Sequence, residues 1–460
     1  MRPPFIRYCA AALIVVGACT SATEPRVNDT GGFPYRLSAN SVRVFGTTHL
    51  IVLPMQFADG ASPPVTRQAL AQSLFAPSNG GPVAALFNLA SGGMFTLRGD
   101  VGNWSRSTVR HDELGTRGRM APTRDGDYVL EAIQAADASI DFGQYDDDGP
   151  DGFPNSGDDD GVVDGGIVVM NSDRNTYCDN DLSHGLHPNT NTRWVDSTGH
   201  PFSTNDRSAR GGKIGIRGYS LMSAVACDGH SVPANTLAHE LGHLLFQLPD
   251  LYHAVSTAIP RWTARRWIVG CWELMAAGSD WGCGSGTPHY GSTEMAAFGA
   301  WTRTLIGWST PTIIPNDRDS TYTLHALGSG GTVLQIPIAS GEFLLVEYRE
   351  PGPIDVTPPA AGVLIYHVAV DLPYYPPVDG PRQYKVSLIE ADDNGALLRT
   401  DGEGGDRGVA ADAFGVLRSE LVPGSHSGAV AINGTPFPFS LREIVIDRAN
   451  HIARFRVAPR

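Results

Sequence analysis

Two histidines and a glutamate stand at a spacing that can do chemistry. The stretch reads His239-Glu240-Leu241-Gly242-His243. Positions four apart share one face of a helix, so both imidazoles can reach one metal ion. Glu240 then projects near the open side of that metal, where a carboxylate can take a proton from a bound water. The pattern predicts a hydrolytic zinc site with Glu240 as the general base.

The sequence around these residues is itself helical. Asn235 is a suitable N-cap, and a stripe of leucines follows at the spacing of one helix face, namely Leu237, Leu241, Leu244, Leu245 and Leu248. This stripe predicts that one face of the helix packs into the core and that the histidines face away from it. Pro249 would end the helix and swing the chain back, so that Asp250 can approach the metal as a third ligand. His253 and Glu273 compete for that role.

A second candidate site is acidic. Between Asp146 and Asp164 lie eight aspartates interleaved with glycines. Two triads have spacings that suit Ca²⁺: Asp146, Asp148 and Asp151, and likewise Asp158, Asp160 and Asp164. Such carboxylates repel unless a hard cation or water separates them, and glycines let the backbone fold around an ion. The alternative is a solvated acidic loop without an ion, because the twelve-residue EF-hand pattern is incomplete.

Composition narrows the class of protein. With 460 residues the chain can bury a large core and is long enough for two domains. The 53 glycines and 33 prolines favour a turn-rich, β-rich architecture over a helical bundle. The net charge of −14 and the lack of a basic stripe argue against nucleic acid as a partner.

The N-terminus indicates export. Residues 1–18 read as a signal peptide, because Arg2 and Arg7 precede an apolar run that is too short to span a bilayer. The following Val16-Gly17-Ala18-Cys19 resembles a bacterial lipobox, in which the cysteine is lipidated and residues 19–40 serve as a tether. We therefore expect a cell-envelope lipoprotein that touches the membrane only through a lipid on Cys19. Plain secretion is the alternative.

Apart from Cys9 in the leader and Cys19 at its end, four cysteines remain, which is an even set for an exported chain and predicts two disulfides. Three connectivities are possible. Pairing Cys178 with Cys227 and Cys271 with Cys283 is preferred because it keeps the loops short. A four-thiolate zinc site is the rival interpretation, but no CxxC spacing supports it.

Periodicity divides the chain near residue 310. Apolar runs at 48–57 and 166–170 predict buried strands, and 82–89 and 128–138 predict helices, so residues 41–310 are expected to form an α+β catalytic domain. Residues 311–460 change to short alternating runs, which are typical of an all-β, β-sandwich-like domain. These runs are 322–327, 332–338, 343–349, 362–370, 384–390 and 444–457.

Several blocks together resemble the immune inhibitor A family of secreted bacterial zinc metallopeptidases, from about Thr48 to the C-terminus. They are Ser91 to Val101, the acidic loop Tyr145 to Gly165, His239 to Tyr252, Trp272 to Ser279 as a methionine turn, Glu342 to Arg349 and Gly362 to His367. The resemblance implies a zincin-like catalytic domain in which His239, His243 and Asp250 bind zinc. It also implies that Met275 forms an apolar floor below the metal.

The chain departs from the family pattern at one place. The family usually has glycine three residues after the second histidine and aspartate three residues after that glycine. Here Phe246 fills the glycine position, and Asp250 comes one residue late.

These observations lead to a main hypothesis and two rivals. The main hypothesis is an exported zinc-dependent endopeptidase that acts on protein or peptide substrates. The first rival is a lipid-anchored surface binding protein with a degenerate zinc site. A hydrolase of non-peptide substrates would share the same site.

Overall fold

The computed structural model describes residues 44–76, 82–114, 124–175, 178, 188–196, 198–256, 261–279, 281–288, 296–353, 355–356 and 358–460. The expected signal at 1–18, the tether at 19–40 and Cys19 lie outside these ranges, so they stay predictions. None of the described helices is both long and apolar enough to cross a lipid bilayer.

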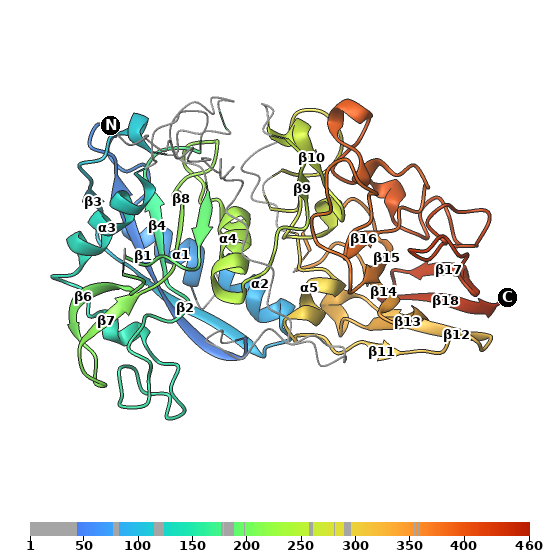
Figure 1. The fold of residues 1–460 in the computed structure, drawn as a ribbon, viewed down its shortest axis with the longest axis horizontal. Helices are drawn as coiled ribbons and strands as arrows, with labels where there is room; N and C mark the ends of the chain where they lie inside the picture. Colours follow the sequence, from blue (N-terminus) through green and yellow to red (C-terminus); the bar gives the residue numbers. More distant parts are fainter. Residues whose placement is uncertain are drawn as a thin grey trace, which may run out of the picture.

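The first half of the chain is built on one sheet, at the left of Figure 1. Its strands run in the order β2 (Phe95–Val101), β1 (Gly46–Gln56), β4 (Ile167–Asn171), β8 (Tyr219–Ser223) and β5 (Asn189–Asn191), and β3 (Ser105–Arg106) also pairs with β1. All pairs are parallel except that of β5, which runs antiparallel to β8 at the edge. Parallel strands need cover on both faces. Accordingly Val52 and Leu53, neighbours in β1, enter different cores.

Helices supply that cover. The core on one face contains side chains of α1 (Arg67–Phe75), α2 (Pro82–Ala90) and α4 (Ala234–Phe246). The other face is covered by α3 (Asp125–Ala136) and by the hairpin of β6 (Phe202–Arg207) and β7 (Lys213–Ile216). The strands predicted at 48–57 and 166–170 and the helices predicted at 82–89 and 128–138 are confirmed to within a few residues. This half is therefore a mixed α/β unit.

The chain between α4 and the second half is less regular and is fixed by short pairings and a disulfide. β9 (His253–Ala254) and β10 (Arg265–Arg266) pair antiparallel, and α5 (Ala300–Leu305) follows. In the described residues, short 3-10 helices lie at His111–Glu113, Phe142–Tyr145, Arg261–Ala264, Gly270–Trp272, Leu327–Ser329, Ala396–Leu398, Asp401–Glu403 and Ala410–Asp412. Both preferred disulfides are confirmed, Cys178 with Cys227 and Cys271 with Cys283.

The second half is rich in strands, as its alternating pattern predicts (Figure 1, right). One sheet has the order β11 (Thr312–Ile313), β13 (Val333–Ala339), β14 (Glu342–Arg349), β15 (Gly362–Ala369) and β16 (Val386–Leu388). The other has β12 (Ser320–His325), β18 (Ile452–Pro459) and β17 (Phe439–Asp447). The inner faces of the two sheets share one hydrophobic cluster, which includes Leu344, Phe439 and Phe455.

The predicted start of the last hairpin was wrong. The alternation indicates a strand from residue 444, whereas β17 begins at Phe439. The register of β17 against β18 shifts between Arg442 and Val445, and Glu443 has a φ of 55°. A bulge of this kind shifts the alternation of side chains between the two faces, so Phe439 and Leu441 are out of phase with Ile444 and the two parts do not read as one strand in the sequence.

The two halves share one continuous core. Leu237 of α4 and Trp272 belong to the same buried cluster as Leu345 of β14 and Tyr366 of β15. Neighbouring residues of β14 point the other way, and Leu344 packs into the cluster between the two C-terminal sheets. The β11–β16 sheet therefore has an apolar face toward each neighbouring layer, and the N-terminal half provides one of these layers.

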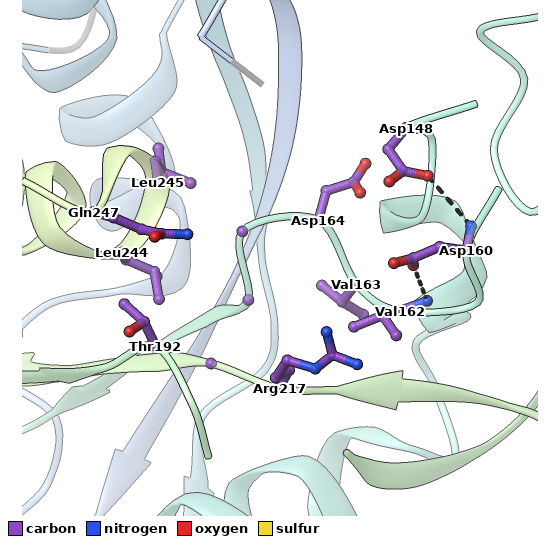
Figure 2. A pocket seen from close by; sticks show the side chains of 13 residues that line it. Asp148, Asp160, Val162, Val163, Asp164, Thr192, Arg217, Leu244, Leu245 and Gln247 are labelled. Atoms are coloured by element: carbon purple, nitrogen blue, oxygen red, sulfur yellow. Dashed lines mark hydrogen bonds between the residues drawn. The ribbon is translucent and has the colours of Figure 1, made fainter. Parts of the chain in front are cut away.

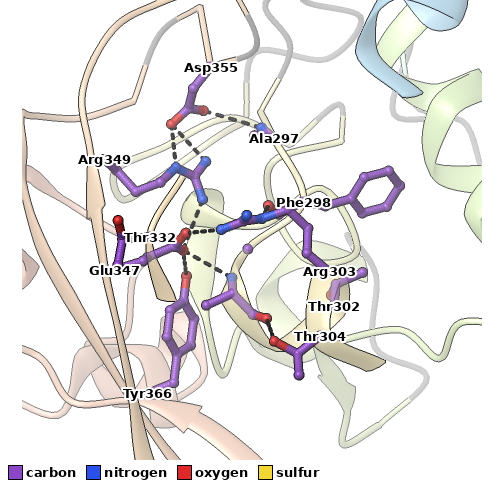
Figure 3. Close-up of polar contacts among 12 residues, drawn as sticks. Ala297, Phe298, Thr302, Arg303, Thr304, Thr332, Glu347, Arg349, Asp355 and Tyr366 are labelled. Atoms are coloured by element: carbon purple, nitrogen blue, oxygen red, sulfur yellow. Dashed lines mark hydrogen bonds and ion pairs between the residues drawn. The ribbon is translucent and has the colours of Figure 1, made fainter. Parts of the chain in front are cut away.

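Charged side chains are buried inside this junction (Figure 3). Arg303 of α5 lies 2.7 Å from Glu347 of β14, and Arg349 lies 2.7 Å from Asp355 and 3.3 Å from Glu347. Burial alone would raise the pKa of Glu347, but the charges of Arg349 and Arg303 hold it below the usual value. Arg349 also donates to the carbonyl oxygen of Trp272 at 3.1 Å. The network thus ties the C-terminal sheet to the segment that follows α4.

Removing Arg349 should therefore destabilise the whole protein. Arg349→Met leaves Glu347 and Asp355 buried without their shared cation, and we expect it to lower the free energy of unfolding by about 3–5 kcal/mol. Arg442→Met, which breaks the exposed 3.2 Å pair with Glu420, is the control and should cost less than about 1 kcal/mol. Denaturant unfolding measures both variants, and equal effects would contradict a structural role for the buried network.

Candidate metal centre

The two motif histidines project from α4 one turn apart. The helix begins at Ala234 after Pro233, so Asn235 lies in the first turn and is not the N-cap that the sequence predicts. Every residue of α4 is buried, and its leucines join the larger core cluster, as the stripe predicts. The rings of His239 and His243 lie with their centroids 4.7 Å apart.

The helix ends at Phe246, and the next residue reverses the chain. Gln247 adopts a left-handed conformation with a φ of 53°, and its N–H bonds back to the carbonyl oxygens of Gly242 and His243. The N–H of Leu248 also bonds to Gly242, at 3.2 Å. The reversal precedes Pro249, which therefore follows the helix end and does not cause it. Asp250 comes three residues after the reversal, the same interval that separates glycine from aspartate in the family pattern.

This turn brings three donor atoms into a small triangle. Nε2 of His239 and Nε2 of His243 are 3.2 Å apart, and Oδ1 of Asp250 lies 3.1 and 3.3 Å from them. Donors about 2.0–2.1 Å from a tetrahedrally coordinated zinc ion lie roughly 3.3 Å from one another. The three side chains thus already have the spacing that a tetrahedral ion requires.

Hydrogen bonds on the far side of each ring set its tautomer. Nδ1 of His239 donates to the carbonyl oxygen of Leu274 at 2.9 Å, and Nδ1 of His243 donates to that of Leu248 at 2.6 Å. Each Nε2 then presents a lone pair toward the triangle, as a metal ligand must. Asp250 Oδ1 is buried and accepts no hydrogen bond from the described residues. Three electron-rich atoms therefore face one another.

The electrostatics also favour a positive charge at this point. Burial alone would lower the pKa of His239, but contact with Asp250 and the charge of that carboxylate raise the pKa to about 9. Burial alone would raise the pKa of Asp250, yet the charges of His243 and His239 hold it far below its usual value. The donor set of two imidazoles and one carboxylate suits zinc.

Glu240 is buried beside the triangle and is held by the edge strand β5. Thr190 donates from Oγ1 to Glu240 Oε2 at 2.6 Å, and the same hydroxyl lies 2.7 Å from that of Ser220 in β8. Burial raises the pKa of Glu240. The sequence does not predict the contact of Thr190 with Glu240, because β5 has only three residues and packs against α4 only in the folded chain.

The segment that resembles a methionine turn packs under α4. Leu274 provides the carbonyl that orients His239, and the carbonyl of Met275 accepts the N–H of Leu251 at 2.7 Å. A Cβ added at Gly242 would lie 2.6 Å from Met275 Sδ. The motif glycine is thus needed because the methionine side chain touches the helix backbone there.

The other proposed third ligands lie elsewhere. His253 Nδ1 is 3.2 Å from the hydroxyl of Tyr384, and burial lowers the pKa of His253 to about 4. Glu273 accepts hydrogen bonds from the N–H groups of Met275 and Gly299 and so fixes the turn. Asp250 alone among the three joins the histidine pair as a potential metal ligand.

The acidic loop forms one group, not the two expected triads. Its ends meet, because the N–H of Asp164 bonds to the carbonyl of Tyr145, and Asp146, Asp148 and Asp164 come close enough to share an ion. Asp160 accepts the N–H of Val162. Asp151 and Asp158 are joined to each other, since the N–H of Asp151 lies 3.2 Å from the Asp158 carboxylate. The sequence spacing therefore does not show which carboxylates meet.

The shared group contains buried charge. Oδ1 of Asp146 is buried and has no hydrogen-bond partner among the described residues. Burial, together with the charges of Asp159 and Asp160, raises the pKa of Asp146 to about 7. Burial also raises the pKa of Asp164 to about 9. A cation between these carboxylates would relieve both penalties.

The acidic loop lies next to the end of α4. A small open pocket of about 70 Å³ separates them, with Asp148 and Asp164 on one side and Leu244 and Gln247 on the other (Figure 2). At Gly165 the two segments touch, since a Cβ there would lie 2.5 Å from Leu245 Cδ2. A loop held in one conformation would thus restrain the last turn of α4 through this contact.

The left-handed conformation of Gln247 predicts how substitutions at this position change stability. A left-handed residue other than glycine costs about 1–2 kcal/mol, so Gln247→Gly should raise the free energy of unfolding by up to about 1 kcal/mol and keep zinc affinity. Gln247→Val should lower stability by about 1–2 kcal/mol and weaken zinc binding, because the branched side chain displaces Asp250. Denaturant unfolding and competition with a zinc chelator measure these effects.

Gln72 is the matched control, because it is exposed within the right-handed helix α1. There Gln72→Gly should lower stability by about 1 kcal/mol. The same sign at both positions would contradict the proposed strain at Gln247.

Comparison with known proteins agrees with this geometry. A family model described as the immune inhibitor A peptidase M6 catalytic domain matches residues 71–308, more than half of the 460 residues. None of the curated proteins compared with the chain matches it significantly. The matched region contains α4, the reversal, Asp250 and the methionine turn. The chain therefore belongs to the immune inhibitor A peptidase family and is a metallopeptidase.

Proposed function

We propose that this metallopeptidase is an exported, zinc-dependent endopeptidase with Glu240 as its general base. The observation that carries the proposal is the triangle of donor atoms 3.1–3.3 Å apart beside a buried glutamate. Residues 41–310 would form a zincin-like catalytic domain, and residues 311–460 a β-sandwich-like domain. The substrate is a protein or peptide, as membership of a peptidase family implies.

His239, His243 and Asp250 would hold the zinc. A zinc ion bound there lowers the pKa of a coordinated water and polarises the scissile carbonyl. Glu240 takes the proton of the attacking water and returns it to the leaving amine, so the carboxylate ends the cycle as it began. Because burial raises its pKa, Glu240 is a stronger proton acceptor than an exposed glutamate.

Positioning residues keep Glu240 in reach of this proton. Thr190 donates to one carboxylate oxygen, which leaves the other for the reacting water. Ser220 lies against Thr190 and so fixes the hydroxyl from the neighbouring strand β8. The edge of the sheet is thus part of the catalytic arrangement.

Calcium is the second cofactor that we propose. Asp146, Asp148 and Asp164 would bind it, supported by the unpartnered buried oxygen of Asp146. The ion would order the loop that packs on Leu245, and hence the end of α4. Its role is structural.

Export is supported by two observations. The chain has a signal-like segment at 1–18, and both disulfides of the described region form, which is typical of oxidising compartments. We propose a cell-envelope lipoprotein anchored through Cys19.

Glu240→Gln tests the chemistry. The amide keeps the shape and the contact with Thr190 but cannot accept a proton, so cleavage of casein should fall by about 10²–10⁴-fold while zinc stays at one ion per chain. Metal analysis and a peptide digest measure the two properties. Glu420→Gln, at an exposed glutamate, is the control and should cleave normally.

Undiminished cleavage by the Glu240→Gln protein would overturn the assigned base. Purified protein with neither zinc nor cleavage would overturn the enzyme and favour the lipid-anchored binding protein.

Thr190→Val tests the positioning role. Loss of a hydrogen bond to a charged group costs about 1.5–3 kcal/mol, so kcat should fall roughly 10- to 100-fold with KM and zinc content unchanged. Thr190→Ser keeps the hydroxyl and should restore most of the rate. If serine and valine were equally impaired, the effect would come from packing and not from the hydrogen bond.

A further inference from the structure

A second group of carboxylates lies in the C-terminal half, far in sequence from the acidic loop. Glu390 and Asp392 follow β16, and Asp412 ends the 3-10 helix Ala410–Asp412. Each offers one oxygen, and these oxygens all lie within 4.8 Å of one another. Glu390 and Asp412 are buried, and Asp392 is half-buried. The proposed peptidase chemistry does not use this group, in which Glu390 also accepts the N–H groups of Ala396 and Leu397 at 2.7 and 3.2 Å.

Asp412 has an unsatisfied buried oxygen. Its side chain is fully buried, and Oδ2 accepts hydrogen bonds from Trp272 Nε1 at 3.2 Å and from the N–H of Val409 at 2.8 Å. Oδ1 has no hydrogen-bond partner among the described residues. A buried charged oxygen without a partner is costly, so it needs a proton or a cation.

Protein cations do not neutralise the group. No described basic side chain forms an ion pair with these three carboxylates, and the nearby Arg407 donates to the carbonyl oxygens of Gly282, Cys283 and Gly286. Arg399 donates to the carbonyl of Asn394. A fourth acid, Asp406, lies close enough for its charge to act on Asp412.

The carboxylates therefore hold unfavourable charge. Burial, together with the charge of Asp412, raises the pKa of Glu390 to about 8. Burial also raises the pKa of Asp412 to about 7.

We propose that Glu390, Asp392 and Asp412 bind a Ca²⁺ ion. All the donors are hard oxygens, which suit calcium better than zinc. Calcium–oxygen distances of about 2.3–2.6 Å allow ligands up to roughly 5 Å apart across the ion, which fits the observed spread.

Such an ion would fasten the C-terminal half to the methionine-turn segment. Asp412 bonds to Trp272, and the N–H of Cys271 bonds to the carbonyl of Arg407 at 2.6 Å. The carbonyl of Leu397 accepts the N–H of Trp267 at 2.9 Å. The loops that carry the three carboxylates are thus the ones that hold the approach to Leu274, which orients His239. This inference stands whether or not the chain cleaves peptides.

Calcium binding to the full, zinc-loaded chain tests the proposal. Asp164→Asn is used as the background, because it disables the other acidic group. Equilibrium dialysis against calcium alone should give one ion per chain in this background, and adding Asp392→Asn should abolish binding or weaken it at least roughly ten-fold. Asp393→Asn is the matched control, since Asp393 bonds to Ser427 and lies outside the group, and it should bind as the background does.

Thermal unfolding provides a second readout. Calcium should raise the Tm of the background by a few degrees, and the increase should vanish with Asp392→Asn but persist with Asp393→Asn. Asp392 is half-buried and bonds only locally to Asn394, so its variant is expected to fold without calcium. Unchanged binding in Asp392→Asn, or no binding by the background, would overturn the proposal.

Discussion

The structure around α4 depends on one unfavourable contact. Two imidazole nitrogens and a carboxylate oxygen are buried within 3.3 Å of one another, and no described group outside this triangle donates a hydrogen bond to Asp250 Oδ1. Such atoms repel unless a cation lies between them. The surrounding structure resists this repulsion: carbonyls of Leu274 and Leu248 clamp the rings, and the methionine turn closes against Gly242.

The C-terminal half contributes to this restraint. The core that covers α4 continues into β14 and β15, and Arg349 reaches across to the carbonyl of Trp272, two residues before the carbonyl that orients His239. Without the C-terminal strands, α4 and the methionine turn would have few other contacts to hold them on the side that these strands cover. The strands beyond residue 310 therefore act as a rigid support for the donor atoms, whatever further surface they offer to a partner.

The sequence predicts best what is local. The four-residue spacing of the histidines, the apolar run of β1 and the separation of 12 between Cys271 and Cys283 each involve residues close in sequence, and the structure confirms the helix, the strand and this disulfide. The Cys178–Cys227 disulfide, with a separation of 49, is also confirmed, because only three pairings of four cysteines had to be compared. Long-range pairings leave no such pattern. The contact of Thr190 with Glu240 and the Arg303–Glu347 pair arise only when distant helices and strands assemble, and the meeting of Asp146 with Asp164 depends on how the loop between them closes. The bulge in β17 shows a third case, in which irregular backbone hides a strand.

The left-handed residue at the end of α4 has a consequence for how relatives are recognised. The identity of the third metal ligand does not depend on a fixed number of residues after the second histidine. It depends on the residue at which the chain reverses after the helix. Gln247 takes that place one step later than the family's glycine, and Asp250 shifts with it. A pattern search with a fixed count between the second histidine and the acid would pass over this chain. In this chain, one extra residue before the turn keeps the three donors together, because Gln247 adopts the positive φ that the reversal requires.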